Sequence, residues 1–172
     1  MDPALATQVI DRSTRPQSRD HGAQHWKAVA WAGLQLASQI DGCDAEIVLL
    51  FALFHDSQRF NEFHDPEHGF RGGQLAREMS KSAFHLNEER LEQLVDACTR
   101  HDKGQLADDP TIAVCWDADR LNLWRVGKTP DPRFLSTAAA CDEDLIAEAA
   151  SFHGRHYTWD DLFAAYAKAL RV

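Results

Sequence analysis

The chain has 172 residues, of which 44% are hydrophobic and 26% charged, as expected for a globular protein with one substantial core. Its formal net charge of −9 at pH 7 argues against a surface that coats nucleic acid or binds anionic membranes. Phosphate groups can bind such a chain only where a metal ion or nearby arginine and lysine side chains make the local electrostatic potential positive.

Helical periodicity dominates the first part of the chain. A short helix is expected near residues 4–10, and a second over 20–40, where apolar residues recur at helical spacing. The stretch 45–55 is apolar on nearly every side, which predicts a buried helix. Residues 57–69 are rich in Asn, Asp, Pro and Gly and indicate a loop.

Apolar stripes and helix-start signals predict five further helices. They cover residues 67–79, 88–100 with Asn87 as the cap, 111–126 after Pro110, 142–152, and 159–170 after the capping-box-like pair Thr158 and Asp161. No segment shows convincing strand alternation. We therefore predict an all-α fold, a single-domain helical bundle of about seven or eight helices.

The cysteines and the hydropathy favour a cytoplasmic location. The four cysteines are scattered without a close pair and are expected to be reduced thiols. The longest apolar stretch, 47–54, is too short to span a bilayer, and the N-terminal segment lacks the regions of a signal peptide. No membrane partner is expected.

The apolar stretch 45–55 ends in the polar pair His55 and Asp56. An ionised carboxylate in an apolar site is strongly disfavoured unless a cation compensates. Imidazole nitrogen and carboxylate oxygen are both good ligands for divalent metals. The pair therefore predicts a metal site whose other ligands lie elsewhere in the chain.

His25 and Asp119 are the candidates for those ligands, because each interrupts an otherwise apolar helical pattern. The order His…His-Asp…Asp, with Ala-Asp-Arg-Leu around Asp119, resembles the HD-domain superfamily of metal-dependent phosphohydrolases over residues 20–125. The resemblance implies that His25, His55, Asp56 and Asp119 hold a divalent ion, which could be Mn, Fe, Co, Ni, Zn or Mg. Asp56 is also the candidate proton acceptor in catalysis.

The resemblance also implies a domain organisation. It assigns residues 1–172 to a single HD-type domain. The motif-bearing core would cover about 20–125, and helices in 140–172 would complete the bundle.

Two of these ligands have close alternatives. His21 precedes His25 by one helical turn and is expected to be a solvated first-turn residue. Asp117 could instead be the metal ligand, or it could orient the ligand Asp119. A second His-Asp pair, 64–65, lies in a polar loop and is expected to be no part of the site. The remaining histidines are expected at the surface: His85, His153 and His156.

Two more histidines resemble elements found in a subset of the same superfamily. His68 opens the sequence His-Gly-Phe-Arg-Gly-Gly, and His101 follows the predicted helix 88–100. By this resemblance they either bind a second metal ion or hold substrate phosphate, so that one or two ions are expected per chain.

Arg59 and Arg71 accompany these motifs and are expected to bind substrate, because guanidinium groups suit bidentate phosphate contacts. Arg120 is expected to pair with nearby acids instead.

We expect a metal-dependent hydrolase acting on a phosphate ester or anhydride of a small nucleotide or related metabolite. An HD-type diiron oxygenase and a non-catalytic, metal-containing ligand-binding module are the alternatives. The expected partner is a small phosphorylated substrate, and the apolar face formed by Trp159, Phe163 and Tyr166 is expected in the core or in a homodimer contact.

Overall fold

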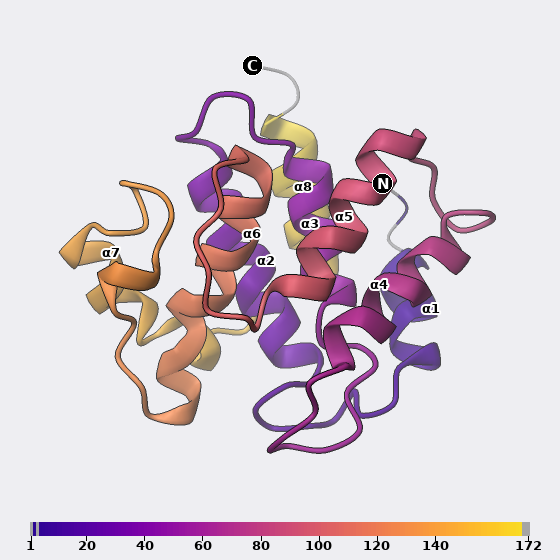
Figure 1. Ribbon diagram of the computed structural model, residues 1–172, viewed down its shortest axis with the longest axis horizontal. Helices are drawn as coiled ribbons and strands as arrows, with labels where there is room; N and C mark the ends of the chain where they lie inside the picture. The colour runs from indigo at the N-terminus through magenta and orange to yellow at the C-terminus, as the bar shows by residue number, and fades with distance from the viewer. Residues whose placement is uncertain (1, 3, 170–172) are drawn as a thin grey trace.

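The chain folds around one apolar helix, α3 (Ala45–Phe54), whose residues Ile47 to Phe54 are all buried (Figure 1). The computed structural model describes residue 2 and residues 4–169, with eight α-helices, three short 3₁₀ helices and no strand among them. The Asp44 carboxylate starts α3 by accepting backbone N–H groups of Glu46 and Ile47. The prediction of an all-α, single-domain bundle of seven or eight helices is confirmed.

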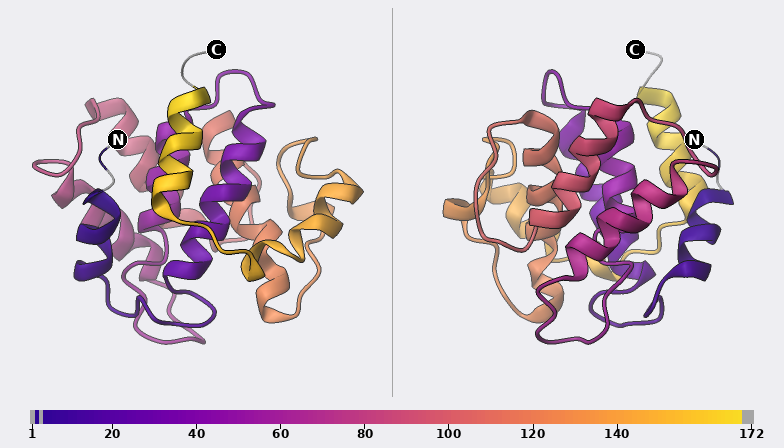
Figure 2. Two further views of the ribbon diagram at one scale, coloured as in Figure 1. Left: turned by 180° about the vertical axis from the view of Figure 1, so that it is seen from behind. Right: turned by 45° about the vertical axis from the view of Figure 1, so that its right-hand side comes forward.

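Four helices surround α3 and carry most of the remaining polar motifs. They are α2 (Ala23–Ala37), α4 (His68–Met79), α5 (Glu88–Arg100) and α6 (Pro110–Leu121). Helices α4 and α5 lie along each other, and α2 lies against α6 on the other side of α3. Two more helices cover this group: α1 (Ala4–Arg12) contacts α3, and α8 (Trp159–Ala169) packs on α2 (Figure 2).

The segment between α6 and α8 has less regular structure than predicted. The expected helix 111–126 ends at Leu121 and continues as the 3₁₀ helix η1 (Asn122–Val126), which stops at Gly127 with φ +73°. The expected helix 142–152 is shorter, and the segment contains these elements: η2 (Pro132–Phe134), α7 (Glu143–Ala149) and η3 (Phe152–Gly154).

Local signals placed several helix ends correctly. The Asn87 side chain accepts the backbone N–H of Arg90 at 2.9 Å, and Thr158 Oγ1 accepts that of Asp161 at 3.1 Å. The last predicted helix matches α8, although Leu170 lies outside the described residues. Phe163 and Tyr166 are buried, which places the expected apolar face in the core.

Glycines let α4 approach its neighbours closely. A Cβ atom at Gly69 would lie 2.2 Å from the backbone oxygen of Cys98 on α5, and one at Gly72 would lie 2.2 Å from that of Phe54 on α3. Any larger residue would push these helices apart. The two glycines therefore bring the start of α4 against the ends of α3 and α5.

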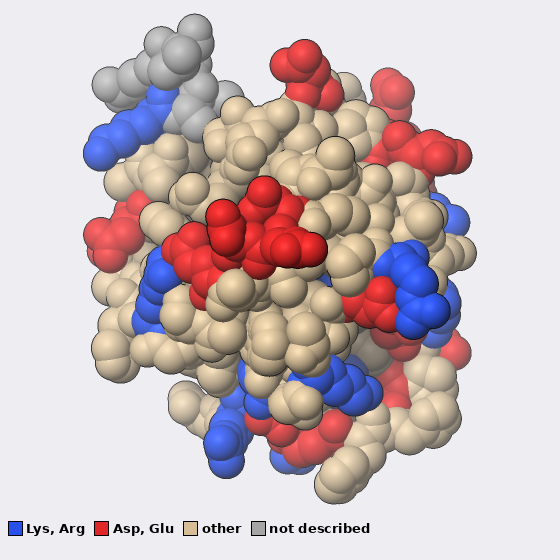
Figure 3. All heavy atoms as spheres, turned by 90° about the vertical axis from the view of Figure 1, so that its left-hand side faces the viewer, with Lys and Arg blue, Asp and Glu red and all other residues tan. Residues whose placement is uncertain are grey.

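Among the described residues, none of the helices combines the length and the apolar character that a bilayer crossing requires. The four cysteines are free thiols. On the face where α7 lies, acidic and basic side chains are interspersed, and the described atoms form no continuous basic surface there (Figure 3).

Candidate metal centre

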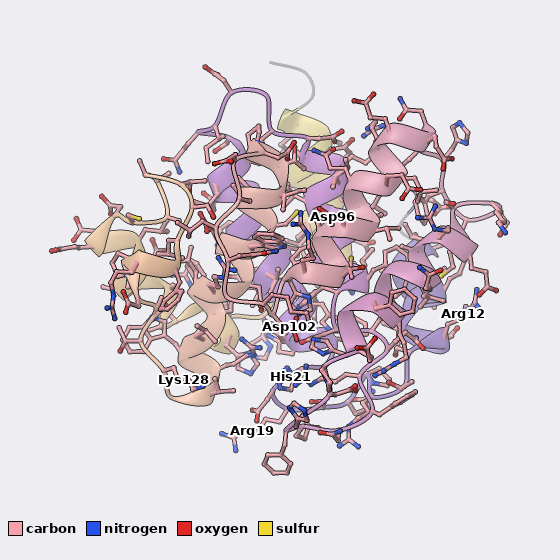
Figure 4. All side chains as sticks on the ribbon, in the orientation of Figure 1. Arg12, Arg19, His21, Asp96, Asp102 and Lys128 are labelled. Carbon is pink, nitrogen blue, oxygen red and sulfur yellow. The ribbon has the colours of Figure 1, made fainter. Side chains whose placement is uncertain are left out.

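Five helix ends meet in the lower half of the molecule as drawn in Figure 1. They are the N-terminal ends of α2 and α4 and the C-terminal ends of α3, α5 and α6, and each supplies a histidine or an aspartate. His21, Asp102 and Lys128 are labelled in the lower half of Figure 4, whereas Asp96 on α5 lies above them. Polar side chains from distant parts of the sequence are thus gathered in one place.

The first group of candidate ligands contains the four residues expected to bind a metal. His25 Nε2 and His55 Nε2 lie 3.2 Å apart, and each lies 3.6 Å from Asp56 Oδ2. Asp119 Oδ1 lies 3.1 Å from His25 Nε2 and 3.9 Å from His55 Nε2. Both imidazoles are completely buried. The structure therefore brings together His25, His55, Asp56 and Asp119 around one small space.

The second group contains the two additional histidines. His68 Nε2 and His101 Nε2 lie 3.0 Å apart, and they lie 3.1 and 3.8 Å from Asp56 Oδ1. All three residues are buried, so this group could hold an ion in the same manner as the first. Asp56 belongs to both groups, with one carboxylate oxygen directed to each.

Hydrogen bonds fix the orientation of three of the four imidazoles. The Nδ1 atoms of His55, His68 and His101 face the backbone oxygens of Phe51, Asp65 and Cys98, respectively. An imidazole nitrogen that faces a carbonyl oxygen must carry the proton, so the Nε2 lone pairs point into the site. This is the arrangement found when histidine binds a metal through Nε2.

Without a cation, this arrangement leaves several lone pairs facing one another. Asp119 Oδ1 and His25 Nδ1 are buried and have no hydrogen-bond partner among the described residues. A buried acceptor without a donor costs about 1–3 kcal/mol, and more when it is charged. A divalent ion bound by Asp119 Oδ1 and the Nε2 atoms of His25 and His55 would remove that cost for Asp119 Oδ1, so these residues fit a metal ion.

The protonation states also suit metal binding in the first group. Burial lowers the pKa of His25 to about 3, helped by the nearby Arg125 guanidinium, and burial lowers the pKa of His55 to about 4. Both rings are therefore neutral near pH 7. Burial by itself would raise the pKa of Asp56, but the surrounding imidazoles hold it well below its usual value.

His101 differs from the two histidines of the first group. Burial is the largest influence and opposes its protonation, but Asp56, Asp119 and the Cys98 backbone oxygen together outweigh burial and raise the pKa of His101. Asp119 remains ionised because His25 and Arg125 outweigh the effect of burial and keep its pKa well below the usual value. A metal ion in the second group would therefore have to displace a proton, whereas one in the first would not.

His21 is not the solvated first-turn residue that the sequence predicts. It precedes α2, which begins at Ala23, and its side chain is only 13% exposed. Its Nδ1 atom lies 3.0 Å from Asp56 Oδ2. The prediction failed because His21 is outside the helix, so helical spacing could not give its direction.

Asp117 lies away from both groups. Its two carboxylate oxygens accept the backbone N–H groups of Ser136 and Thr137 and the hydroxyl of Thr137, at 2.7 to 2.8 Å. The choice of Asp119 over Asp117 as the candidate ligand is therefore supported, and Asp117 holds the segment after η2. The expected pairing of Arg120 with acids is replaced by hydrogen bonds to the backbone oxygens of Phe134 and Gln105.

The two arginines expected to bind substrate have different positions. Arg59 Nη1 lies beside the second group, 3.0 Å from His68 Nε2 and 3.5 Å from Asp56 Oδ1. Arg71 instead pairs with Asp65 at 2.6 Å and covers the ring of Phe60. Since Arg71 is outside the described lining of the cavity beside the metal groups, its expected role in substrate binding gains no support.

Arg125 on η1 was missed by sequence reasoning. Its side chain is 5% exposed, with Nη1 3.8 Å from Asp119 Oδ1 and Nη2 3.5 Å from His21 Nδ1. The only sequence signal was its position six residues after Asp119. That spacing does not predict where the Arg125 side chain points, because α6 ends at Leu121 and a 3₁₀ helix follows.

The remaining histidines are outside the two groups. His64 is exposed, and His85 and His156 are exposed as expected, whereas His153, which lies within η3, is half-buried and not at the surface as predicted. Asp65 is buried but structural, because its side chain accepts the backbone N–H of Phe60 and the Arg71 guanidinium. The 64–65 pair is therefore not a metal site.

A cavity of about 940 Å³ opens beside both groups and reaches Asp56, His68, His101 and Asp119. Its lining contains five basic residues, Arg59, Lys103, Arg120, Arg125 and Lys128, and five acidic residues besides Asp56 and Asp119, which are Asp20, Glu62, Asp65, Asp102 and Asp131. Phe63 and Phe134, 91% and 48% exposed, lie at its wall. Groups complementary to a small anion are therefore local, at Arg59 and Arg125 beside the two ligand groups.

Models of known protein families, curated proteins and solved structures were each compared with the chain, and none matches it. The candidate metal centre therefore rests on its geometry, which is compatible with an HD-type arrangement of histidine and aspartate.

Proposed function

We propose that this protein is a metal-dependent phosphohydrolase that cleaves a phosphate ester or anhydride of a small nucleotide or related metabolite. The observation that carries the proposal is the sharing of Asp56 between two buried ligand groups at the base of a cavity with basic side chains. A divalent ion held there would supply an activated water and polarise a phosphoryl oxygen.

The chain's own residues would position the substrate. Arg59 and Arg125 are buried beside the two ligand groups and can neutralise phosphate oxygens, while Lys128 lies further out along the cavity. Guanidinium groups offer several fixed donors to a phosphate, which favours one orientation of the scissile bond.

We assign Asp56 to holding metal ions and not to accepting a proton. Its low pKa makes the carboxylate a weak base, and both oxygens already face imidazole nitrogens. This changes the catalytic role expected for Asp56 from the sequence.

The rest of the substrate would lie against the outer wall of the cavity. Phe63 and Phe134 present ring surfaces there, which suits a planar base. A nucleotide therefore fits the cavity better than a phosphorylated ligand without an apolar portion.

The test is phosphate release from a panel of nucleotides and simple phosphate esters. The metal-free protein should be loaded separately with Mn, Fe, Co, Ni, Zn or Mg, and His55→Ala should serve as the control for contaminating phosphatases. Turnover by the wild type alone is expected. Absence of turnover with every metal, despite a filled site, would contradict the proposal. Substrate-dependent oxygen uptake by an iron-loaded protein would favour an oxygenase instead.

A further inference from the structure

Arg59 occupies an unusual position for a buried arginine. It follows α3 by a short turn, and its residue is 8% exposed. Nε donates to the backbone oxygen of Asn61 at 3.0 Å, and Nη2 donates to that of Phe63 at 3.2 Å. The guanidinium is thereby held with Nη1 directed at the second ligand group.

The contacts of Nη1 are with the atoms that would bind a second metal ion. Nη1 lies 3.0 Å from His68 Nε2 and 3.5 Å from Asp56 Oδ1. Because His68 Nδ1 carries its proton toward the Asp65 backbone oxygen, Nε2 has a single lone pair to offer. That lone pair cannot accept a hydrogen bond from Arg59 and bind a metal ion simultaneously.

We propose that Arg59 and a second divalent ion are alternative occupants of the group formed by Asp56, His68 and His101. The protein then binds one ion tightly, at His25, His55, Asp56 and Asp119, and a second ion only when Arg59 leaves. This inference rests on the metal sites of the proposed function, but it does not depend on which reaction follows.

A phosphate group is the ligand suited to draw Arg59 away. Arg59 lines the cavity, and the residues whose backbone oxygens hold it, Asn61 and Phe63, are themselves exposed. A phosphate in the cavity offers the guanidinium charged acceptors in exchange for two backbone oxygens, the His68 nitrogen and the Asp56 carboxylate oxygen, which lies 3.5 Å away. Phosphate and the second ion should therefore bind cooperatively, and each should raise the affinity of the other by the same factor.

The expected change in the affinity of the second ion depends on how often Arg59 occupies the second group. If Arg59 occupies the second group about nine-tenths of the time, the apparent dissociation constant of the second ion is raised about tenfold. Removing the guanidinium should restore the intrinsic affinity. The affinity of the first ion should change much less, because Arg59 contacts only the Oδ1 side of Asp56.

The experiment is a titration of the metal-free protein with Mn²⁺, followed by calorimetry and electron paramagnetic resonance. Two ions that share the Asp56 carboxylate should show spin coupling, whereas a single ion should not. The variant is Arg59→Gln, and Arg125→Gln is the control that also removes a buried guanidinium, here one that faces Asp119. Circular dichroism should verify that both variants are folded.

The proposal expects one tight and one weak ion in the wild type, and a second ion bound at least about tenfold more tightly in Arg59→Gln. An equal increase in the affinity of the second ion in Arg125→Gln would overturn the proposal, because the increase would then be explained by the change in net charge. Two equally tight ions in the wild type would also overturn it.

A second measurement needs only the wild-type protein. Inorganic phosphate should strengthen binding of the second Mn²⁺ ion, with appearance of the coupled signal. An unchanged affinity of the second ion at saturating phosphate would overturn the proposal. Failure of the proposed function is distinct, since it would appear as absence of turnover with the metal count intact.

Discussion

His68 Nε2 and His101 Nε2 lie 3.0 Å apart, although the opposite nitrogen of each ring faces a backbone oxygen. Two neutral rings in this arrangement would direct their lone pairs at each other. Arg59 Nη1 faces the His68 lone pair, and a proton on His101, whose pKa is raised by the Asp56 and Asp119 carboxylates, would relieve the remaining repulsion, as would a metal ion.

The two metal ions should differ in their dependence on pH. The second ion must displace the proton of His101, so its affinity should rise by up to about tenfold per pH unit until the pH exceeds the raised pKa. The first ion meets His25 and His55, whose pKa values of about 3 and about 4 leave them neutral above about pH 5. Calorimetry in buffers of different ionisation enthalpy measures the protons released at each step. Equal proton release by the two ions would contradict this assignment.

Asp117→Asn and Asp119→Asn should differ in their effect on metal binding, although the substitutions are isosteric and two residues apart. Asp117→Asn places an amide N–H against donors from Ser136 and Thr137, which should lower the free energy of unfolding by about 1–3 kcal/mol and leave metal binding intact. Asp119→Asn should abolish tight binding of the first ion. It should also lower the stability of the metal-free protein at neutral pH, because the Asp119 carboxylate, whose pKa is held well below its usual value, faces the buried Arg125 guanidinium at 3.8 Å.

Urea denaturation and metal analysis of the two variants measure these effects. Loss of the first ion in Asp117→Asn, with Asp119→Asn retaining it, would reverse the assignment of the ligand.

Gly69→Ala should weaken the second metal site by moving α4 away from α5. The new Cβ atom would lie 2.2 Å from the Cys98 backbone oxygen and 3.1 Å from His101 Nδ1. Overpacking of this kind costs about 1–3 kcal/mol of stability. The matched control is Gly154→Ala, since no atom lies within 4 Å of a Cβ placed there. Thermal denaturation and Mn²⁺ titration should show a defect only in Gly69→Ala; a similar loss in both variants would refute the close-contact explanation.

Phe63→Ala should weaken the binding of nucleotides without affecting simple phosphate esters. Stacking of a base on an aromatic ring contributes about 1–3 kcal/mol, so a rise in KM or Kd of about tenfold or more is expected. Phe70→Ala is the control, because Phe70 is 47% exposed but lies outside the described lining of the cavity. Calorimetric titration with a nucleoside monophosphate measures the effect even without turnover. An equal loss of affinity for a simple phosphate ester would show that Phe63 maintains the structure of the loop and does not bind the base.

Local sequence signals were sufficient for most of the fold. The apolar stretch that became α3 has no polar side, so burial at the centre of the bundle was the arrangement that its composition favoured. The Asn87 and Thr158 caps acted through backbone groups only three residues away. Such signals do not depend on how the helices pack.

The ligands could be only partly chosen from the sequence. Asp117 and Asp119 both interrupt an apolar pattern, and they point about 200° apart around α6, since each residue of an α-helix turns about 100°. Helix α6 is buried on both of those sides, so periodicity could not show which aspartate faces His25. The contacts of Asp117 with Ser136 and Thr137, from a different part of the chain, distinguish them.

The sequence by itself determined an all-helical chain and a set of histidines and aspartates suited to a metal. Only the tertiary structure decided that Asp56 joins two ligand groups, that His21 and Arg125 border them, and that Arg59 faces the second. The physical reason is that helix formation depends on neighbours within about one turn, whereas the direction of a loop or 3₁₀ side chain depends on distant packing. His21, Arg59 and Arg125 lie just outside α-helices, where spacing along the chain does not predict which way a side chain points.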